Sequence, residues 1–391
     1  MGKNYTIIEV HDRKTRREFR MLQVRLYKKD KAYIRPLDRD IERVFDPGKN
    51  KFFRHGECTR WILQDAQGKS IGRVAAFIDR KTAEKNDQPT GGMGFFDCIK
   101  DQEAASLLFD QCKQWLQTRG MEAMDGPINF GERNQWWGLL VDGFYEPNYC
   151  MPYNFGYYRE LFENYGFQLY FKQFTFHRTI QGGLSDVVRT KADKILQNPD
   201  YSFRPLEKSK LSSAIEDFRD VYNKGWVKHA GVAQMSSVQA KALFKSIKSI
   251  LDPDLLWFAY YKNEPVAFYF MLPELNQIFK YMNGKFHLIN KLRFLYYKKR
   301  KVCKKMLGML FGVVPEHQGK GVEAAIVVAF TRLAFKPGFK YNEIEMNWIG
   351  DFNPKMIHVA EQIGAKIYKT HHTYRYLFDR SKPFSRAPMI D

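Results

Sequence analysis

The chain has 391 residues, of which 44% are hydrophobic and 27% charged, so it can form two domains with sizeable cores and is not expected to be disordered. Its net charge of +20 favours an anionic partner, such as a polyanionic cofactor, an anionic membrane surface or nucleic acid. The five cysteines are an odd number without a Cys-x-x-Cys pair, and no His-x-x-x-His pattern occurs. We therefore expect neither a disulfide framework nor a metal site.

The first half is predicted to open with a strand at 5–10 and a basic helix at 13–30. A hairpin follows at 58–79, because two apolar runs flank the turn sequence Asp-Ala-Gln-Gly. An amphipathic helix covers 103–120 and ends at Gly120 as its C-cap.

The second half repeats this order, with helices at 211–226 and 238–251, a hairpin at 255–273, a helix at 321–338 and a strand at 341–349. Both halves also close with an Asn-capped helix, a glycine stop and a strand, which involve Asn154 with Gly166 and Asn353 with Gly364. We therefore predict tandem copies of one α/β module, residues 1–185 and 190–391, with a linker near 181–200.

Residues 313–326, VVPEHQGKGVEAAI, combine a strand end, a glycine turn and the start of a helix. Glycines let the backbone approach a ligand, and the free N–H groups of a first helical turn bind phosphate. Lys320 adds positive charge, whereas Glu323 brings a carboxylate to the place of a phosphate. On backbone physics alone, the stretch is either a phosphate-binding loop or a plain turn.

This loop, followed by a helix, a strand and then DFNPKM and EQIGAKIYKT, resembles the GNAT superfamily of acyl-CoA N-acyltransferases. The family's pyrophosphate loop reads Gln/Arg-x-x-Gly-x-Gly/Ala, which Gln318 and Gly321 match and Glu323 does not. The resemblance covers about 200–391 and, more faintly, 1–180. It implies an α/β (α+β) fold of tandem GNAT-like modules, with mixed central sheets flanked by helices.

The resemblance further implies acyl-CoA or coenzyme A as co-substrate, and no metal. The residues that it places on the cofactor are Val313, Val314, Gln318, Gly319, Lys320, Gly321, Val322 and Asn353. The first half reads GFFDCIKDQEAASLL at the corresponding place, where Asp97, Asp101 and Glu103 take the position of the phosphate. We expect no cofactor in that half, which would instead support or shape the acceptor pocket.

Further stretches resemble a narrower group of bacterial tandem-GNAT proteins, which includes ceramide-synthase-type N-acyltransferases of bacterial sphingolipid synthesis. These stretches are GPINFGERNQWWGLLVDGF, YCMPYNFGYYRELFENYGF, YNKGWVKHAGV and EMNWIGDFN. They contain Trp137 and Trp226, which are candidates for an acyl-chain or acceptor pocket, with core packing as the alternative.

Acyl transfer from a thioester to an amine requires a donor that polarises the carbonyl and a base that takes the amine proton. The resemblance implies that a backbone N–H within Phe311–Val314 is the donor. The polar side of the strand at 341–349 offers Glu343, Glu345 and Asn347 as bases. Glu345 is the preferred candidate, and a surface glutamate is its alternative interpretation.

The leaving thiolate must also be protonated or tolerated. The family's tyrosine for this step lies seven residues after the capping Asn353, where this chain has Ala360. Either another group acts, with Tyr374 as the candidate, or the thiolate leaves unassisted.

Residues 287–306, HLINKLRFLYYKKRKVCKKM, interleave basic with bulky apolar side chains. Such a segment suits the surface of an anionic membrane, to which each Lys or Arg contributes about 1 kcal/mol. A solvated loop with a buried aromatic side is the alternative. The apolar runs are too short to span a membrane and no signal peptide is visible, so we expect a cytoplasmic protein that can bind peripherally to the inner face.

The leading prediction is an acyl-CoA-dependent N-acyltransferase that acts on a small-molecule or lipid amine, such as a sphingoid base. An aminoacyl-tRNA-dependent transferase of tandem-GNAT type also fits the positive charge, although no recognised nucleic-acid-binding module occurs and nucleic acid is not the expected partner. A non-catalytic ligand-binding regulator is the third alternative, because Glu323 and the missing tyrosine depart from the enzyme pattern.

Overall fold

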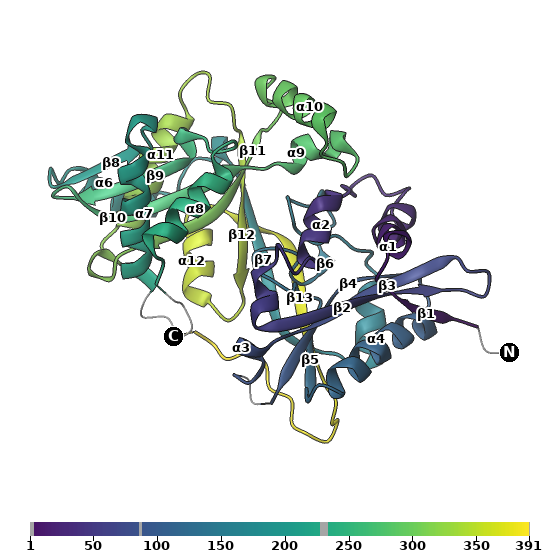
Figure 1. Ribbon diagram of the computed structural model, residues 1–391. Coiled ribbons are helices and arrows are strands. Elements are labelled where there is room, and N and C mark those ends of the chain that lie inside the picture. Colours follow the sequence, from purple (N-terminus) through teal and green to yellow (C-terminus); the bar gives the residue numbers. More distant parts are fainter. Residues whose placement is uncertain (1–3, 86–87, 227–233, 391) are drawn as a thin grey trace.

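The computed structural model describes residues 4–85, 88–226 and 234–390, without the side chain of Trp226. In this part of the chain, thirteen strands form one continuous sheet with helices on both faces (Figure 1). The strands are β1 Thr6–Glu9, β2 Gly56–Gln64, β3 Ser70–Asp79, β4 Thr90–Cys98, β5 Ala123–Gly126, β6 Leu139–Asp142, β7 Gln168–Thr179, β8 Tyr201–Pro205, β9 Leu256–Tyr261, β10 Glu264–Pro273, β11 Lys305–Val313, β12 Glu343–Gly350 and β13 Lys366–Leu377.

The helices confirm the mixed α/β class. They are α1 Arg13–Leu26, α2 Asp38–Val44, α3 Arg80–Ala83, α4 Gln102–Gln117, α5 Tyr158–Tyr165, α6 Asp186–Leu196, α7 Leu211–Trp226, α8 Ser237–Ile247, α9 Asn276–Phe279, α10 Leu288–Lys299, α11 Val322–Ala334 and α12 Pro354–Gln362. Both predicted hairpins are present, as β2–β3 and β9–β10.

The two halves exchange their last strands at the middle of the sheet. The strand order is β1-β2-β3-β4-β5-β13-β7-β12-β11-β10-β9-β8, with β6 pairing beside β13. Thus β13, from the end of the chain, pairs with β5 of the first half, and β7 of the first half pairs with β12. The exchange covers two strand edges that would otherwise expose unpaired backbone groups.

Side chains of the exchanged strands pack into the core of the other half. Tyr374 and Tyr376 of β13 belong to the hydrophobic core of the first half, together with α4 and α5. Phe176 of β7 packs against Ala360 of α12 in the second half. The sequence predicts two modules but not this shared sheet, and the boundaries 1–185 and 190–391 stay a prediction.

Two sequence predictions are wrong in detail. Asn154 does not cap α5, because its side chain hydrogen-bonds to the N–H and the carbonyl of Leu140 in β6. The predicted linker at 181–200 is largely the helix α6, capped by Ser185 and packed against α11 through a shared apolar core. By contrast, Asn353 caps α12 as predicted, since its Oδ1 accepts the Met356 N–H at 3.2 Å.

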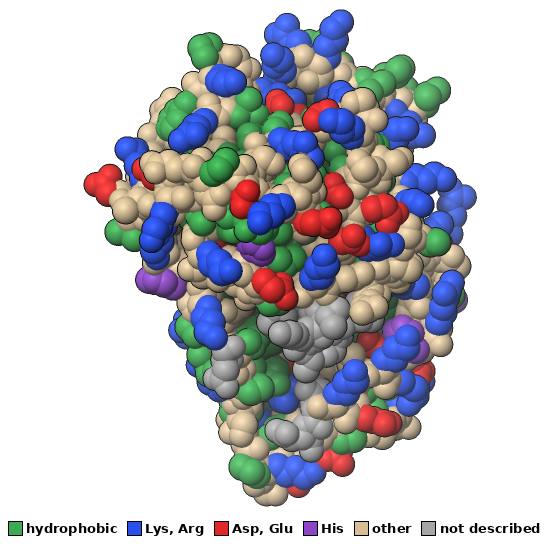
Figure 2. Space-filling view, turned by 90° about the vertical axis from the view of Figure 1, so that its left-hand side faces the viewer, with side chains coloured by type: hydrophobic (Ala, Val, Ile, Leu, Met, Phe, Trp, Pro, Cys, Tyr) green, Lys and Arg blue, Asp and Glu red, His purple; other side chains and the backbone are tan. Residues whose placement is uncertain are grey.

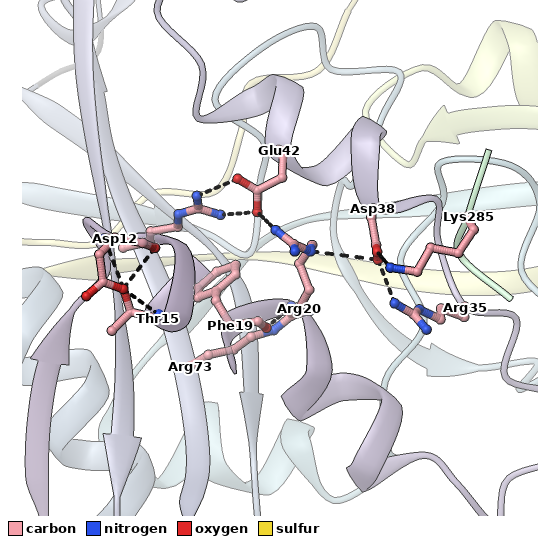
Figure 3. Close-up of polar contacts among 10 residues, drawn as sticks. Asp12, Thr15, Phe19, Arg20, Arg35, Asp38, Glu42, Arg73 and Lys285 are labelled. Atoms are coloured by element: carbon pink, nitrogen blue, oxygen red, sulfur yellow. Dashed lines mark hydrogen bonds and ion pairs between the residues drawn. The ribbon is translucent and has the colours of Figure 1, made fainter. Parts of the chain in front are cut away.

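Polar contacts between the halves hold α2 against the segment that leads into α10. Lys285 Nζ donates to Asp38 Oδ2 at 2.9 Å, and Arg35 and Arg20 approach the other oxygen of Asp38 (Figure 3). Farther along α2, Glu42 accepts from Arg20 at 2.6 Å and thereby continues the network (Figure 3). These contacts position α9 and α10 next to the first half.

The positive charge is not confined to one stripe of the surface. Figure 2 shows Lys and Arg side chains over the whole of one face, interspersed with Asp and Glu. A continuous basic track, which nucleic-acid binding would favour, is not seen on that face.

Candidate functional site

The two parallel strands β11 and β12 separate after only four paired positions. Lys305–Gly308 pair with Glu343–Met346, and β11 then continues to Val313 without β12 beside it. N–H groups alternate in direction along a strand, and that of Val314 donates to Val266 O of the β10 side at 2.9 Å. The N–H groups of Phe311 and Val313 therefore face the gap between β11 and β12.

A β-bulge marks the point where the gap opens. Gly308 and Leu310 pair with the consecutive residues Met271 and Phe270, so Met309 is the extra residue on β11. Bulges turn a strand and redirect its backbone groups, and they are common next to active sites. The gap thus begins at Met309 and is lined on one side by backbone donors.

The predicted phosphate loop lies at the far end of the same strand. Gln318 Nε2 donates to the carbonyl of Val313 at 2.9 Å, which folds the loop back onto the end of β11. Gly319 and Gly321 have φ angles of 70° and 98°, a region that favours glycine. Val322 then begins α11, whose N-terminus no side chain caps. The structure brings the predicted residues Val313, Val314 and Gln318–Val322 together.

Glu323 contacts this loop directly. Its Oε1 accepts the N–H of Gly319 at 3.3 Å, so a carboxylate engages one of the donors of the loop. The positive end of the α11 dipole stabilises such a charge in the first turn. A bound phosphate would compete with Glu323 for this donor.

The preferred base candidate, Glu345, is fully buried in β12 and is not a surface residue. Its carboxylate accepts from Lys369 Nζ at 2.7 and 2.9 Å and from Lys305 Nζ at 3.1 Å. Burial raises the pKa of Glu345, but the two ammonium groups outweigh that effect and lower it overall. This carboxylate is therefore ionised and fully paired. It is better suited to holding the two lysines in position than to accepting a proton from a substrate.

The two lysines differ in their surroundings. Burial lowers the pKa of Lys369, whose side chain is almost completely enclosed. Lys305 is slightly more exposed, and there the attraction of Glu345 exceeds the effect of burial and raises the pKa. The cluster of Glu345, Lys305 and Lys369 carries a net positive charge when both lysines are protonated.

Strand register places this cluster on one face of the central strands, which we name the polar face. Glu345 pairs with Leu307 of β11, and Lys369 and His371 of β13 pair with Thr175 and Gln173 of β7. Paired residues lie on the same face of a sheet. The helix α11 lies on the opposite face, where its Val327 and Phe330 line a small cavity together with Ile344.

Trp137 covers the polar face beside the gap. It is buried against Leu307, Met309 and Trp348, and its ring lies 4.6 Å from that of His371, centroid to centroid. The indole Nε1 of Trp137 and both ring nitrogens of His371 lack hydrogen-bond partners in the described part of the chain. Buried polar groups are nearly always paired, so such a group needs an explanation.

Two further predicted residues, Asn347 and Tyr374, lie in different parts of the central strands. Asn347 Oδ1 is also buried without a partner among the described residues, next to Trp348 in β12. Tyr374 lies on the other face, where its hydroxyl donates to Glu163 of α5 and contacts His372. The structure therefore does not bring Tyr374 to Glu345 and Asn347. The side chain of Trp226 and motif residues 227–233 lie outside the described part.

The first half has its own gap, between β4 and β5, which pair only over Thr90–Gly92 and Ala123–Asp125. Phe95, at a bulge opposite Val74, has a φ of 51°, and Trp136 has a φ of 41°. Strained residues of this kind cluster at functional sites. Both line a cavity that also includes aromatic and aliphatic side chains such as Met151 and Tyr153.

No glycine loop follows β4. Asp101 caps α4 by accepting the Ala104 N–H at 3.0 Å, and Asp97 is buried in an ion pair with Arg73. Both acidic side chains thus have structural partners near the position that a phosphate would take, and the absence of a cofactor from this half stays a prediction. In the described residues there is no cluster of three or more His, Cys, Asp or Glu that could hold a metal. None of the described helices is long and apolar enough to cross a bilayer.

Some site residues escaped the sequence analysis. Lys369, His371 and Thr373 alternate along β13 and all lie on its polar face. Alternating polar residues in a central strand would indicate a functional face of the sheet. The sequence does not show that β13 is a central strand, because that position depends on the strand exchange.

The gap, the bulge and the glycine loop define a class of fold. The tandem GNAT protein from the clavulanic acid biosynthesis pathway superposes with a TM-score of 0.55 over 97% of this chain and 100% of that one, at 9% identity. The chain therefore has the tandem GNAT fold, as its sequence predicts.

Two curated relatives cover most of the chain. It is 26% identical over 364 residues to the bacterial ceramide synthase of Caulobacter vibrioides (strain NA1000 / CB15N), spanning 92% of this chain and 94% of that protein. It is also 26% identical over 362 residues to protein YghO of Escherichia coli (strain K12), spanning 89% of both. No protein-family model matches the chain.

The competition at the loop gives a first prediction. Replacing Glu323 by Ala frees the Gly319 N–H and removes a negative charge close to a phosphate, an interaction of about 1 kcal/mol across partly hydrated groups. We expect coenzyme A to bind roughly fivefold more tightly to Glu323→Ala, as measured by isothermal titration calorimetry. Glu316→Ala, a nearby exposed acidic residue, is the control and is expected to change less. A tenfold loss of affinity in Glu323→Ala would show that the carboxylate builds the loop.

Proposed function

We propose that this protein transfers an acyl group from acyl-CoA to a primary amine at the gap between β11 and β12. The proposal rests on strand β11 and the loop that follows it, because both present backbone N–H groups on the side of the gap. Phe311 and Val313 direct N–H groups into the gap, and the loop Gln318–Val322 presents further N–H groups at its end. A thioester-bearing arm with a pyrophosphate at its far end matches this arrangement.

The chemistry of the chain's own residues follows from this placement. The N–H groups facing the gap stabilise negative charge on the thioester oxygen as the amine attacks. The net positive cluster of Lys305, Glu345 and Lys369 lies on the polar face where β11 and β12 are still paired, and its charge favours the anionic intermediate and the departing thiolate. Met309, Trp137 and Trp348 exclude water from the reacting atoms.

We further propose that the acceptor is a lipid amine of the sphingoid type. The similarity to the bacterial ceramide synthase supports this class, as do the aromatic and aliphatic side chains of the cavity at the β4–β5 gap, which the ion pair of Arg73 and Asp97 also lines. Met151 lines that cavity and also packs against Trp137, so it connects the lining of the cavity with the side chains that cover the polar face. In this proposal the first half holds the hydrocarbon part of the acceptor.

Location at an anionic membrane surface is the remaining part of the proposal, and α10 supports it. Asn290 and Phe294 turn inward, whereas five large apolar side chains are more than half exposed. These are Leu288, Ile289, Leu292, Leu295 and Tyr296. Lys291, Arg293 and Lys298–Lys301 are exposed around them, which is the composition of an interfacial helix on anionic lipid.

The proposed reaction predicts that palmitoyl-CoA and sphinganine yield the N-acyl amide with release of one equivalent of free thiol. Mass spectrometry detects the amide, and a thiol reagent follows the rate. Gly321→Ala adds a Cβ that would lie 2.8 Å from the Lys191 carbonyl oxygen, at a φ of 98°. We expect its KM for acyl-CoA to rise at least tenfold, because the loop must move.

The matched control is Gly338→Ala. Gly338 has a similar φ of 90°, but a Cβ there has no neighbour within 4 Å and the residue lies beyond the end of α11. Comparable KM values for the two variants would separate acyl-CoA binding from this loop. Absence of amide product across chain lengths and amines would reject the proposed reaction itself.

The membrane proposal predicts that the protein sediments with vesicles of phosphatidylglycerol and phosphatidylcholine, and much less with phosphatidylcholine alone. Leu292→Ser combined with Leu295→Ser removes two exposed apolar groups, and vesicle affinity is expected to fall roughly thirtyfold. Val238→Ser, at a valine of α8 that is even more exposed than the two leucines, is the control. Unchanged sedimentation of the double variant, or binding to tRNA in place of vesicles, would contradict this role of α10.

A further inference from the structure

We infer that His371 is the group that accepts the proton of the attacking amine. The inference rests on the proposed function and assigns a role within it that neither the fold nor the relatives name. His371 lies at the centre of β13, a strand that the second half contributes to the shared sheet. It is completely buried, yet neither ring nitrogen has a partner among the described residues.

The position of His371 fits a partner that comes from outside the protein. Its ring meets Trp137 edge to face at 4.6 Å, and Trp137 in turn packs against Met309 and Trp348 at the opening of the gap. Trp137 Nε1 and Asn347 Oδ1 are likewise buried and unpaired in the described part. The unpaired groups of His371 and Trp137, whose rings are in contact, thus lie beside the gap, where the acceptor amine would meet the thioester.

His371 is neutral and can accept a hydrogen bond, and the same surroundings that keep it neutral make it a weak proton acceptor. Burial, and next the positive charge of Lys369, lower its pKa to about 3, so the imidazole is neutral at any physiological pH. A neutral imidazole can accept a hydrogen bond from the amine and orient its lone pair toward the thioester carbon. Glu345 does not offer this, because both of its oxygens are already bonded to lysine.

Proton transfer through His371 would accompany formation of the amide bond. The amine nitrogen forms a bond to the thioester carbon, the carbon–sulfur bond breaks, and the amine proton passes to His371. The departing thiolate then takes that proton from the imidazolium, which restores neutral His371. Lys369 destabilises the imidazolium, so the return of the proton is favoured. This route does not require the tyrosine that Ala360 replaces.

His372 and His177 differ from His371 in having side-chain partners, although burial also lowers the pKa of His372. His372 is the next residue in β13 and lies on the opposite face, where its Nδ1 is 3.1 Å from the Tyr374 hydroxyl. His177 is hydrogen-bonded to Glu343 at 2.7 Å. His372 therefore provides a control of equal sequence context and similar burial.

The test measures turnover and acyl-CoA affinity of His371→Gly and His371→Asn in the full chain. We expect kcat to fall about 100-fold or more in both variants, the magnitude typical of general base catalysis, while the Kd for acyl-CoA stays within threefold. His372→Asn is expected to retain kcat within fivefold. Unchanged acyl-CoA binding shows that the variants are folded.

Chemical rescue separates proton transfer from a packing role. Imidazoles of differing pKa are added to His371→Gly, whose missing side chain leaves a space next to Trp137. We expect the rescued rate to depend on the pKa of the added base. A rescued rate that does not depend on the pKa of the added imidazole would overturn the role of His371, and so would kcat values of the variants within threefold of wild type. In both cases the acyl transfer by the wild type would still stand. A wild type without turnover would instead remove the proposed function together with this inference.

Discussion

Pairing of β7 with β12, and of β13 with β5, is the constraint on which the rest of the structure depends. The exchange joins two sheets into one and places strands of both halves side by side at the centre. It also carries Lys369 and His371 next to Glu345 of β12, since β7 lies between the two strands with matched register. The polar face therefore exists only because the two halves share one sheet.

The two halves use the same architecture for different purposes. Both contain a pair of parallel strands that separate, and both have a bulge at that point, at Phe95 in β4 and at Met309 in β11. Only the second half continues into a glycine loop, whereas Asp101 caps the equivalent helix of the first half. One gap is thus followed by a loop of backbone donors, and the other adjoins a cavity lined by aromatic and aliphatic side chains together with Arg73 and Asp97.

The sequence predicted the local structure and the loop well, because both depend on neighbouring residues. The hairpins, the Asn353 cap and the glycines of the loop follow from turn and cap chemistry that acts over a few positions. Glu345 was found by strand alternation, but its two lysines come from β11 and β13 and could not be paired without the topology. His371 could not be recognised for the same reason, because nothing local in the sequence indicates what covers each face of β13.

Hydrogen–deuterium exchange with a non-hydrolysable thioether analogue of acyl-CoA tests most directly whether the β11–β12 gap and its loop hold the donor. Backbone amides in 309–314 and 318–324 are predicted to exchange more slowly in the complex, because Phe311, Val313 and the loop would then be hydrogen-bonded to ligand. Amides in 93–103, at the corresponding place of the first half, are predicted to be unchanged. Protection of 93–103 without protection of 309–324 would contradict this assignment of the two gaps.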